Sequence, residues 1–293
     1  MKKNIAVLIG ITLLCSVAHA DDWSTLNIVA TTYSTTTYVQ LLVSDPSGRQ
    51  TGFLASSGTR VQTIPGSSYF TESVDNDETG EAGNQVARFG VGPVSSGTYI
   101  VELNGLANTT YVLSLDASDI SGGALNVSPA SFTGYLQPST TKQFTLSVDP
   151  TPGTKLVLTP VLTFASIKGD LHAAYLLGQI GNKHFVNELD DVLAQGEKAL
   201  ARMNRDHDKH NDAGDNDGKR EAVAKLREFV KRIESAAKVK PGDVGRGRDR
   251  DDDDRHFATA MAAQSLTADA DALIVQLGGK ISRGRDDHGE GRH

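Results

Sequence analysis

An abrupt change of residue chemistry near residue 165 is the feature that most constrains the fold of this chain. Residues 21–165 contain 40 serines and threonines and 17 charged residues, whereas residues 166–293 contain 6 and 46. Apolar residues recur at every second position before the change and at every third or fourth position after it. The first period is typical of half-buried strands and the second of amphipathic helices. The sequence therefore predicts a multidomain chain, with an all-β domain at 21–165 and an all-α domain at 166–280.

Alternating apolar residues in the first region predict antiparallel strands, each with one buried face. Four triplets show this pattern: Val39, Leu41 and Val43; Tyr99, Val101 and Leu103; Tyr111, Leu113 and Leu115; and Phe144, Leu146 and Val148. Clusters of turn-forming residues lie between them, at 45–48, 64–67, 95–97 and 104–105. Eight to ten short strands at this spacing predict an antiparallel β-sandwich of the jelly-roll type.

Three apolar stripes at helical spacing predict a bundle of three or four helices in the second region, with a shorter helix first at 167–177. The stripes are Phe185, Leu189, Val192, Leu193, Leu200 and Met203; Val223, Leu226, Val230, Ile233 and Ala237; and Leu266, Ala270, Leu273 and Leu277. Turn residues at 181–182, 216–218 and 241–242 are expected to separate the helices. Residues 281–293 are rich in glycine and charge, so we expect a disordered tail.

The first twenty residues have the pattern of a secretory signal peptide. Lys2 and Lys3 precede an apolar core, and small residues at Ala18 and Ala20 form a cleavage site. We therefore expect cleavage after Ala20 and a secreted or periplasmic product of 273 residues, which is 293 less 20. The one cysteine, Cys15, lies inside this segment, so thiol catalysis and Cys-ligated metal sites are excluded from the product.

Charge and motifs exclude several classes of function. Without the first twenty residues the chain has 27 Lys and Arg against 36 Asp and Glu, a net charge of −9, which disfavours nucleic acid as a partner. Beyond the signal segment, no apolar run approaches the roughly 20 residues that span a bilayer, so no membrane insertion is expected. The sequence has no nucleophile elbow, zinc-protease helix, phosphate-binding loop or dinucleotide fingerprint. We therefore expect no enzyme, no catalytic residues and no cofactor other than a calcium ion.

Local motifs in the first region resemble one known family. Residues 41–48, 63–66, 96–105 and 111–113 together resemble the pre-peptidase C-terminal domains of bacteria. The resemblance covers about residues 33–117. It implies a β-sandwich that accompanies exported proteases without being catalytic.

Motifs in the second region lie at 178–182, Leu189, Leu193, 222–230 and 269–274. Together they resemble the FIMAH helical module, which is found near the C-terminus of secreted and surface proteins of bacteria. This resemblance covers residues 171–277 and departs from the family by long polar insertions at 205–217 and 244–255. The family has no established catalytic residues, so the resemblance implies an accessory or surface role.

Two clusters of polar residues are candidate metal sites. An acidic loop offers oxygen ligands suited to calcium, from Asp75, Asp77, Glu78 and Glu81. A second segment, expected as a loop between two helices, offers imidazole and carboxylate ligands suited to a transition metal, from His207, Asp208 and His210. Neither spacing matches a preformed site, so solvated loops are the alternative interpretation of both clusters.

These expectations describe an exported, non-catalytic accessory or surface-binding protein of a bacterium. Its partner would be a protein or a polysaccharide surface, and no oligomeric state follows from the patterns. Two alternatives are open. One is a module that binds calcium or a transition metal, and the other is an uncatalogued extracellular hydrolase that uses acidic residues at the rim of the sandwich.

Overall fold

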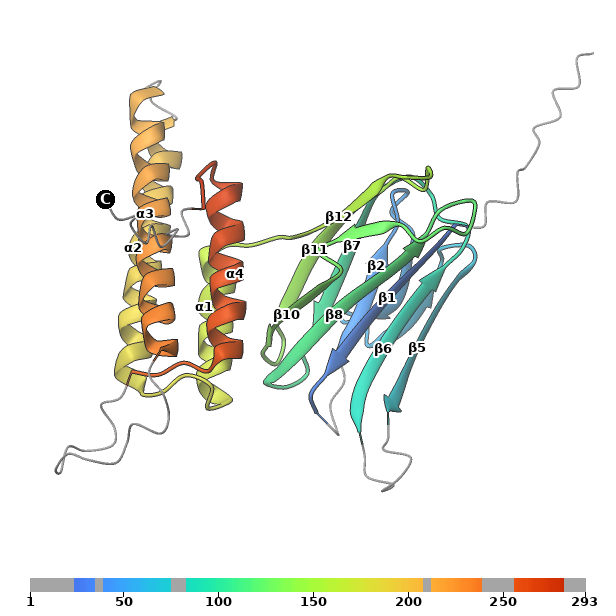
Figure 1. Ribbon diagram of the computed structural model, residues 1–293, viewed down its shortest axis with the longest axis horizontal. Helices are drawn as coiled ribbons and strands as arrows, with labels where there is room; N and C mark the ends of the chain where they lie inside the picture. The colour runs from blue at the N-terminus through green and yellow to red at the C-terminus, as the bar shows by residue number, and fades with distance from the viewer. Residues whose placement is uncertain (1–23, 35–38, 75–82, 208–211, 239–255, 282–293) are drawn as a thin grey trace, which may run out of the picture.

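The structure of the chain is a computed structural model that describes residues 24–34, 39–74, 83–207, 212–238 and 256–281, with the backbone alone at 204–207 and 212–216. Within these residues, twelve strands come first and four helices follow (Figure 1). The predicted signal segment and the predicted tail after Ile281 lie outside the described residues.

Five strands form one sheet in the spatial order β10-β8-β1-β6-β5. They are β1 (Thr25–Thr32), β5 (Ser67–Val74), β6 (Asn84–Val91), β8 (Thr109–Ser118) and β10 (Ser131–Leu136). All neighbouring strands in this sheet run antiparallel. In its centre, Ile28 of β1 is paired with Phe89 of β6 on one side and with Leu115 of β8 on the other.

Seven strands form the second sheet, in the order β4-β3-β2-β7-β11-β12-β9. They are β2 (Gln40–Ser44), β3 (Gln50–Leu54), β4 (Thr59–Gln62), β7 (Gly97–Asn104), β9 (Asn126–Ser128), β11 (Thr141–Val148) and β12 (Lys155–Pro160). The pairing is antiparallel except between β12 and β9, which run parallel. The described strands outnumber the eight to ten expected, because edge strands such as β4 and β9 bury almost nothing and so lack the alternating pattern.

The two sheets pack face to face, which confirms the predicted β-sandwich. All four predicted triplets are buried, from Val39, which directly precedes β2, to Val148 at the end of β11. Leu26, Ile28 and Phe89 of the first sheet belong to the same apolar core as these residues. Removing this inward face from water is the main source of stability for such a fold.

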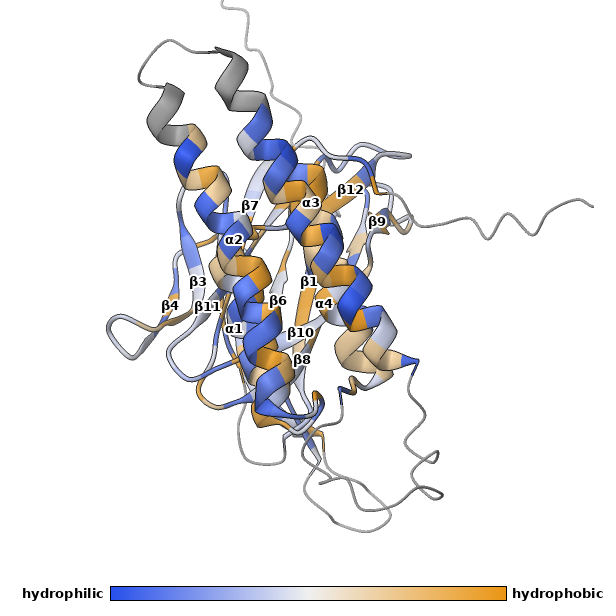
Figure 2. Ribbon diagram, turned by 90° about the vertical axis from the view of Figure 1, so that its left-hand side faces the viewer, coloured by the Kyte–Doolittle hydropathy of each residue, from blue (hydrophilic) through white to orange (hydrophobic). Residues whose placement is uncertain are grey.

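The four helices pack together into the predicted bundle. They are α1 (Phe164–Leu176), α2 (Lys183–His207), α3 (Asp212–Ala237) and α4 (Ala260–Gln276). Polar side chains cap three of the starts. The Thr163 hydroxyl accepts a hydrogen bond from the Ser166 amide at 3.1 Å, the Asn182 side chain accepts one from the Phe185 amide at 2.8 Å, and the Thr259 hydroxyl accepts one from the Ala262 amide at 3.2 Å. Figure 2 shows α2 and α3 as largely hydrophilic helices along which hydrophobic residues recur.

The expected polar loop at 205–217 is wrong, because both flanking helices continue into it. Helix α2 ends at His207 and α3 begins at Asp212, so the turn expected at 216–218 lies inside a helix. A Cβ atom on Gly218 would come 2.9 Å from the Ala199 carbonyl oxygen and 2.9 Å from the Met203 Cβ atom. The glycine therefore allows α2 and α3 to approach each other and does not form a turn.

Helices α1 and α4 cover the β10 edge of the sandwich (Figure 1). The Tyr135 side chain of β10 is fully buried among residues of the helical core, and its hydroxyl donates to the Gln179 side-chain oxygen at 2.5 Å. The Gln179 amide donates in turn to the Thr110 hydroxyl at 3.4 Å, and the Ser265 hydroxyl of α4 donates to the Thr133 carbonyl at 3.0 Å. A bare edge strand exposes unpaired backbone groups, so this contact protects the sheet.

Candidate functional site

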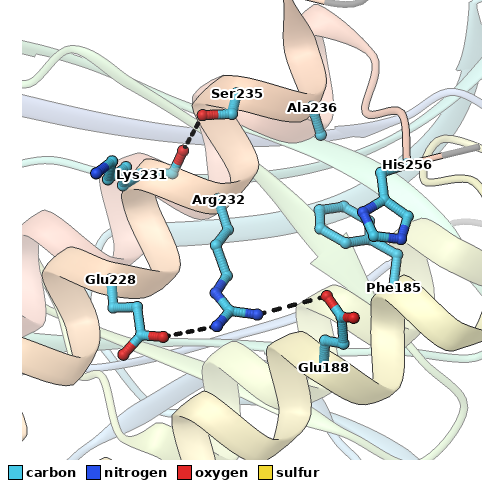
Figure 3. A pocket seen from close by; sticks show the side chains of 8 residues that line it. All are labelled: Phe185, Glu188, Glu228, Lys231, Arg232, Ser235, Ala236 and His256. Atoms are coloured by element: carbon cyan, nitrogen blue, oxygen red, sulfur yellow. Dashed lines mark hydrogen bonds and ion pairs between the residues drawn. The ribbon is translucent and has the colours of Figure 1, made fainter.

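An open groove of about 470 Å³ lies between α2 and α3, next to the segment that leads into α4 (Figure 3). Its lining residues are Phe185, Glu188, Glu228, Lys231, Arg232, Ser235, Ala236 and His256. A volume of this size is within the range of small-ligand sites, about 300–1,000 Å³. The groove is therefore large enough to receive part of a ligand.

One wall of the groove is a pair of stacked rings. The His256 imidazole lies on the Phe185 ring, with centroids 4.6 Å apart and planes 18° apart (Figure 3). Phe185 is only 2% exposed, whereas His256 is exposed. The His184 ring lies 6.3 Å from the His256 ring. A flat imidazole supported from below by an apolar ring is thus presented to solvent.

The other wall is a chain of ion pairs centred on Arg232 (Figure 3). Its Nη2 atom lies 2.7 Å from Glu228 Oε1 and its Nη1 atom lies 3.4 Å from Glu188 Oε2. Each carboxylate has a second neighbour, since Lys225 lies 3.0 Å from Glu228 and His184 lies 3.2 Å from Glu188. The hydrogen bond from Lys225, helped by that from Arg232, holds the pKa of Glu228 below its usual value and outweighs the opposing effect of burial.

Neither predicted metal cluster can be located in the structure. The acidic loop of Asp75, Asp77, Glu78 and Glu81 lies outside the described residues, and so do Asp208 and His210. His207 is the last residue of α2 and not part of a loop, and its side chain is not described. Among the residues that the structure describes, no group of three or more His, Cys, Asp or Glu side chains could hold a metal ion. Both metal sites stay predictions.

The sequence patterns did not predict the groove. Phe185 was expected only as a core residue, and His256 lies 71 positions further along the chain, so no local motif joins the two. A partial signal was present in the spacing of four residues between His184 and Glu188 and between Glu228 and Arg232, which places each pair on one side of a helix. That spacing indicates ion pairs but not the groove between them.

A second cluster of ionisable residues lies at the junction of the sandwich and the helices. Lys142 of β11 places its Nζ atom 2.5 Å from the Asp170 carboxylate of α1, and the two side chains are 11% and 3% exposed. Asp269 of α4 hydrogen-bonds to Asp170. Burial raises the pKa of Asp170, and burial together with the charge of Asp170 raises the pKa of Asp269 well above its usual value.

Comparison with known proteins gave no relatives: no family model, no curated protein and no solved structure matches this chain. The two family resemblances therefore stay predictions that rest on local motifs. What the fold defines is a chain of two parts, a β-sandwich followed by four packed helices. Within the described part of the chain, no helix combines the length and the apolar character needed to cross a membrane.

Proposed function

We propose that this chain is a non-catalytic accessory protein, exported from a bacterial cell, that binds a polysaccharide surface through the groove between α2 and α3. The observation that carries the proposal is the His256–Phe185 ring stack opposite the ion-pair chain of Glu188, Arg232 and Glu228. The expected signal segment at 1–20 supports export.

The ionisation of the groove favours binding over catalysis. A general acid that works at neutral pH needs a raised pKa, as one carboxyl of a glycoside hydrolase has. The pKa of Glu228 is lowered, and Arg232 holds both carboxylates by ion pairs. The two carboxylates can accept hydrogen bonds from a neutral ligand, and Arg232 can donate them. The hydrolase alternative depends on rim residues outside the described part of the chain and stays a prediction.

The size and polarity of the groove favour a sugar over a protein surface. A pyranose ring has a flat C–H face that can lie on the His256 ring and hydroxyl groups that can bond to Glu188, Glu228 and Arg232. Stable protein partners usually bury about 800 Å² on each side around an apolar centre. The apolar residues of the groove, Phe185 and Ala236, are only 2% and 4% exposed, so they offer no such centre.

Binding to soluble glycans tests the proposal. The full chain would be titrated by calorimetry with dextran, chitin oligosaccharides and polygalacturonate, which represent unsubstituted, N-acetylated and acidic polysaccharides. We expect one class to bind, and His256→Ala and Glu228→Gln to weaken that binding about tenfold, equivalent to about 1.4 kcal/mol. The matched control is His172→Ala, because His172 pairs with Asp190 and does not line the groove.

Three results would contradict the proposal. If none of the three glycan classes binds, or if His256→Ala binds as tightly as the wild-type chain, the groove is not a polysaccharide site. If a peptide library yields a ligand whose binding depends on His256 and Glu228 while the glycans do not bind, the partner is a protein.

A further inference from the structure

The buried cluster at the junction brings an amine and a carboxyl group into contact across two parts of the fold. Lys142 lies on the same face of β11 as the buried residues Phe144 and Leu146. This face points into the sandwich, and Lys142 is at the end of it that is nearest to the helices. Its Nζ atom reaches α1, where it lies 2.5 Å from Asp170 Oδ2 and 3.2 Å from the Ser166 carbonyl oxygen. Both side chains are almost fully withdrawn from water, at 11% and 3% exposure.

The cluster contains two carboxyl groups for one cation. Asp269 approaches Asp170 from α4 and hydrogen-bonds to it, so one of the two carboxyl groups holds the shared proton. Two tyrosines complete the surroundings: Tyr135 is fully buried and Tyr111 is 4% exposed, and the charges of both aspartates act on both rings. The raised pKa values of Asp170 and Asp269 follow from this burial.

We propose that Lys142 and Asp170 condense to an intramolecular amide bond that ties β11 to α1, with Asp269 as the group that transfers protons. The Lys142 ammonium first gives a proton to the Asp170 carboxylate, which leaves a neutral amine beside a neutral acid. The amine nitrogen then attacks Asp170 Cγ, a C–N bond forms, and the C–O bond of the acid hydroxyl breaks. Asp269 donates its proton to the departing hydroxyl and takes one proton from the nitrogen. The products are an amide and one water molecule, and no oxidant or cofactor is consumed.

The environment favours each step of this reaction. Burial disfavours charged groups and raises the pKa of Asp170, which favours transfer of a proton to this carboxyl group. The fold holds the nitrogen against the carboxyl group, which replaces an encounter in solution by a contact within one molecule. Because Lys142 and Asp170 are almost fully withdrawn from water, hydrolysis of the product would be slow.

The product would keep its polar atoms satisfied by the partners already in place. The amide N–H would donate to the Ser166 carbonyl oxygen, which already accepts from Lys142. The amide oxygen would accept from protonated Asp269. Buried polar groups require such partners, so the bond leaves neither atom without one.

The intact mass of the full chain tests the inference directly. The chain would be purified and its first residue determined, so that the expected mass is known. We expect the wild-type chain to be lighter than its sequence by the mass of one water molecule. Lys142→Arg and Asp170→Ala should have full mass, and Asp269→Asn should lose water at least tenfold more slowly. After trypsin digestion, a branched peptide should join the segments 89–155 and 169–183, with Lys142 uncleaved.

The matched control is Lys168→Arg, because Lys168 also lies on α1 but pairs with the half-exposed Glu197 at 2.9 Å. This variant should lose water as the wild type does. A wild-type chain of full mass would overturn the inference and leave an ordinary ion pair. Water loss that persists in Lys142→Arg would also overturn it, because the loss would then arise elsewhere, for example by cyclisation at Asp217–Gly218. Neither result depends on the groove between α2 and α3.

Discussion

The groove and the junction both gather carboxylates around a cation, yet the pKa values of these carboxylates move in opposite directions. In the groove, the pKa of Glu228 is lowered by hydrogen bonds from Lys225 and Arg232. At the junction, burial raises the pKa of Asp170 and Asp269 although Lys142 is in contact. The difference indicates that deep burial can outweigh a neighbouring cation in setting the direction of a carboxyl pKa.

The two regions therefore suit different tasks. The groove is open, and its charged side chains Glu188, Glu228 and Arg232 are about a third exposed, so water can replace any ion pair that a ligand displaces. The junction lies under α1 and α4, and Lys142 and Asp170 are only 11% and 3% exposed, so they exchange partners with solvent far less readily. The groove is the region for reversible binding, and the junction is the region that holds the two parts of the chain together.

Removal of the buried carboxylate should have the largest effect. Asp170→Ala removes both the proposed amide bond and the buried Lys142 contact from which it forms, and the loss of a buried pair alone costs about 3–5 kcal/mol. The free energy of unfolding in urea would measure the loss. The control is Asp190→Ala, which breaks the partly exposed pair with His172 and should cost less than about 1 kcal/mol. Equal losses in the two variants would remove the contrast between junction and surface.

Added volume at the junction should have the next largest effect. In Gly134→Ala, the new Cβ atom would lie 2.6 Å from the Tyr111 hydroxyl oxygen and 2.8 Å from the ring, so β10 must shift. Overpacking of this kind costs about 1–3 kcal/mol. Gly169→Ala is the matched control in α1, where nothing lies within 4 Å of the new atom. It should gain about 0.5–1 kcal/mol because alanine favours a helix.

The pH dependence of stability should separate the two kinds of carboxyl group. A raised folded-state pKa, as for Asp269, gives stability that is complete below about pH 4 and is lost as pH rises through the folded pKa. A lowered pKa, as for Glu228, gives stability that is lost as pH falls. We expect Asp269→Asn to flatten the decline of Tm as the pH rises above about 4, and to leave the decline of Tm at lower pH unchanged. A parallel decline in variant and wild type would contradict this assignment.

Weakening the groove's ion pairs should have the smallest effect. Arg232→Gln removes two partly exposed pairs, and such pairs contribute less than about 1 kcal/mol each. The loss should shrink further in about 1 M salt, where the Debye length falls to about 3 Å. Urea unfolding at low and high salt measures it. A loss as large as that of Asp170→Ala would mean that the groove is structural.

Much of the fold could be predicted from the sequence, because the buried apolar residues of a strand or a helix recur at a regular spacing. Val101 and Leu103 alternate with polar residues on a half-buried strand, and Leu189 and Leu193 repeat at helical spacing, so both elements were predicted and both are buried. The prediction failed where an element buries little. The strand β4 and the polar ends of α2 and α3 carry no such pattern, so β4 was missed and the helix ends were assigned to a loop.

The groove and the junction could not be predicted from the spacing of residues, because each is formed by segments that are far apart in the sequence. His256 meets Phe185, and Lys142 meets Asp170 and Asp269, only after the chain has folded. A lysine at an inward position of a strand was the one local signal for the junction, since such a position normally holds an apolar residue.

The covered β10 edge also sets an order in which the chain can finish folding. Thr133 of β10 and its partner Ser265 of α4 are 132 positions apart, and α4 is the last helix described. A chain made from its N-terminus produces the sandwich strands and α1 long before this helix, and in that interval the part of the edge that α4 covers is bare. Exposed strand edges promote aggregation. The newly made protein is therefore most prone to aggregate until α4 has packed against β10.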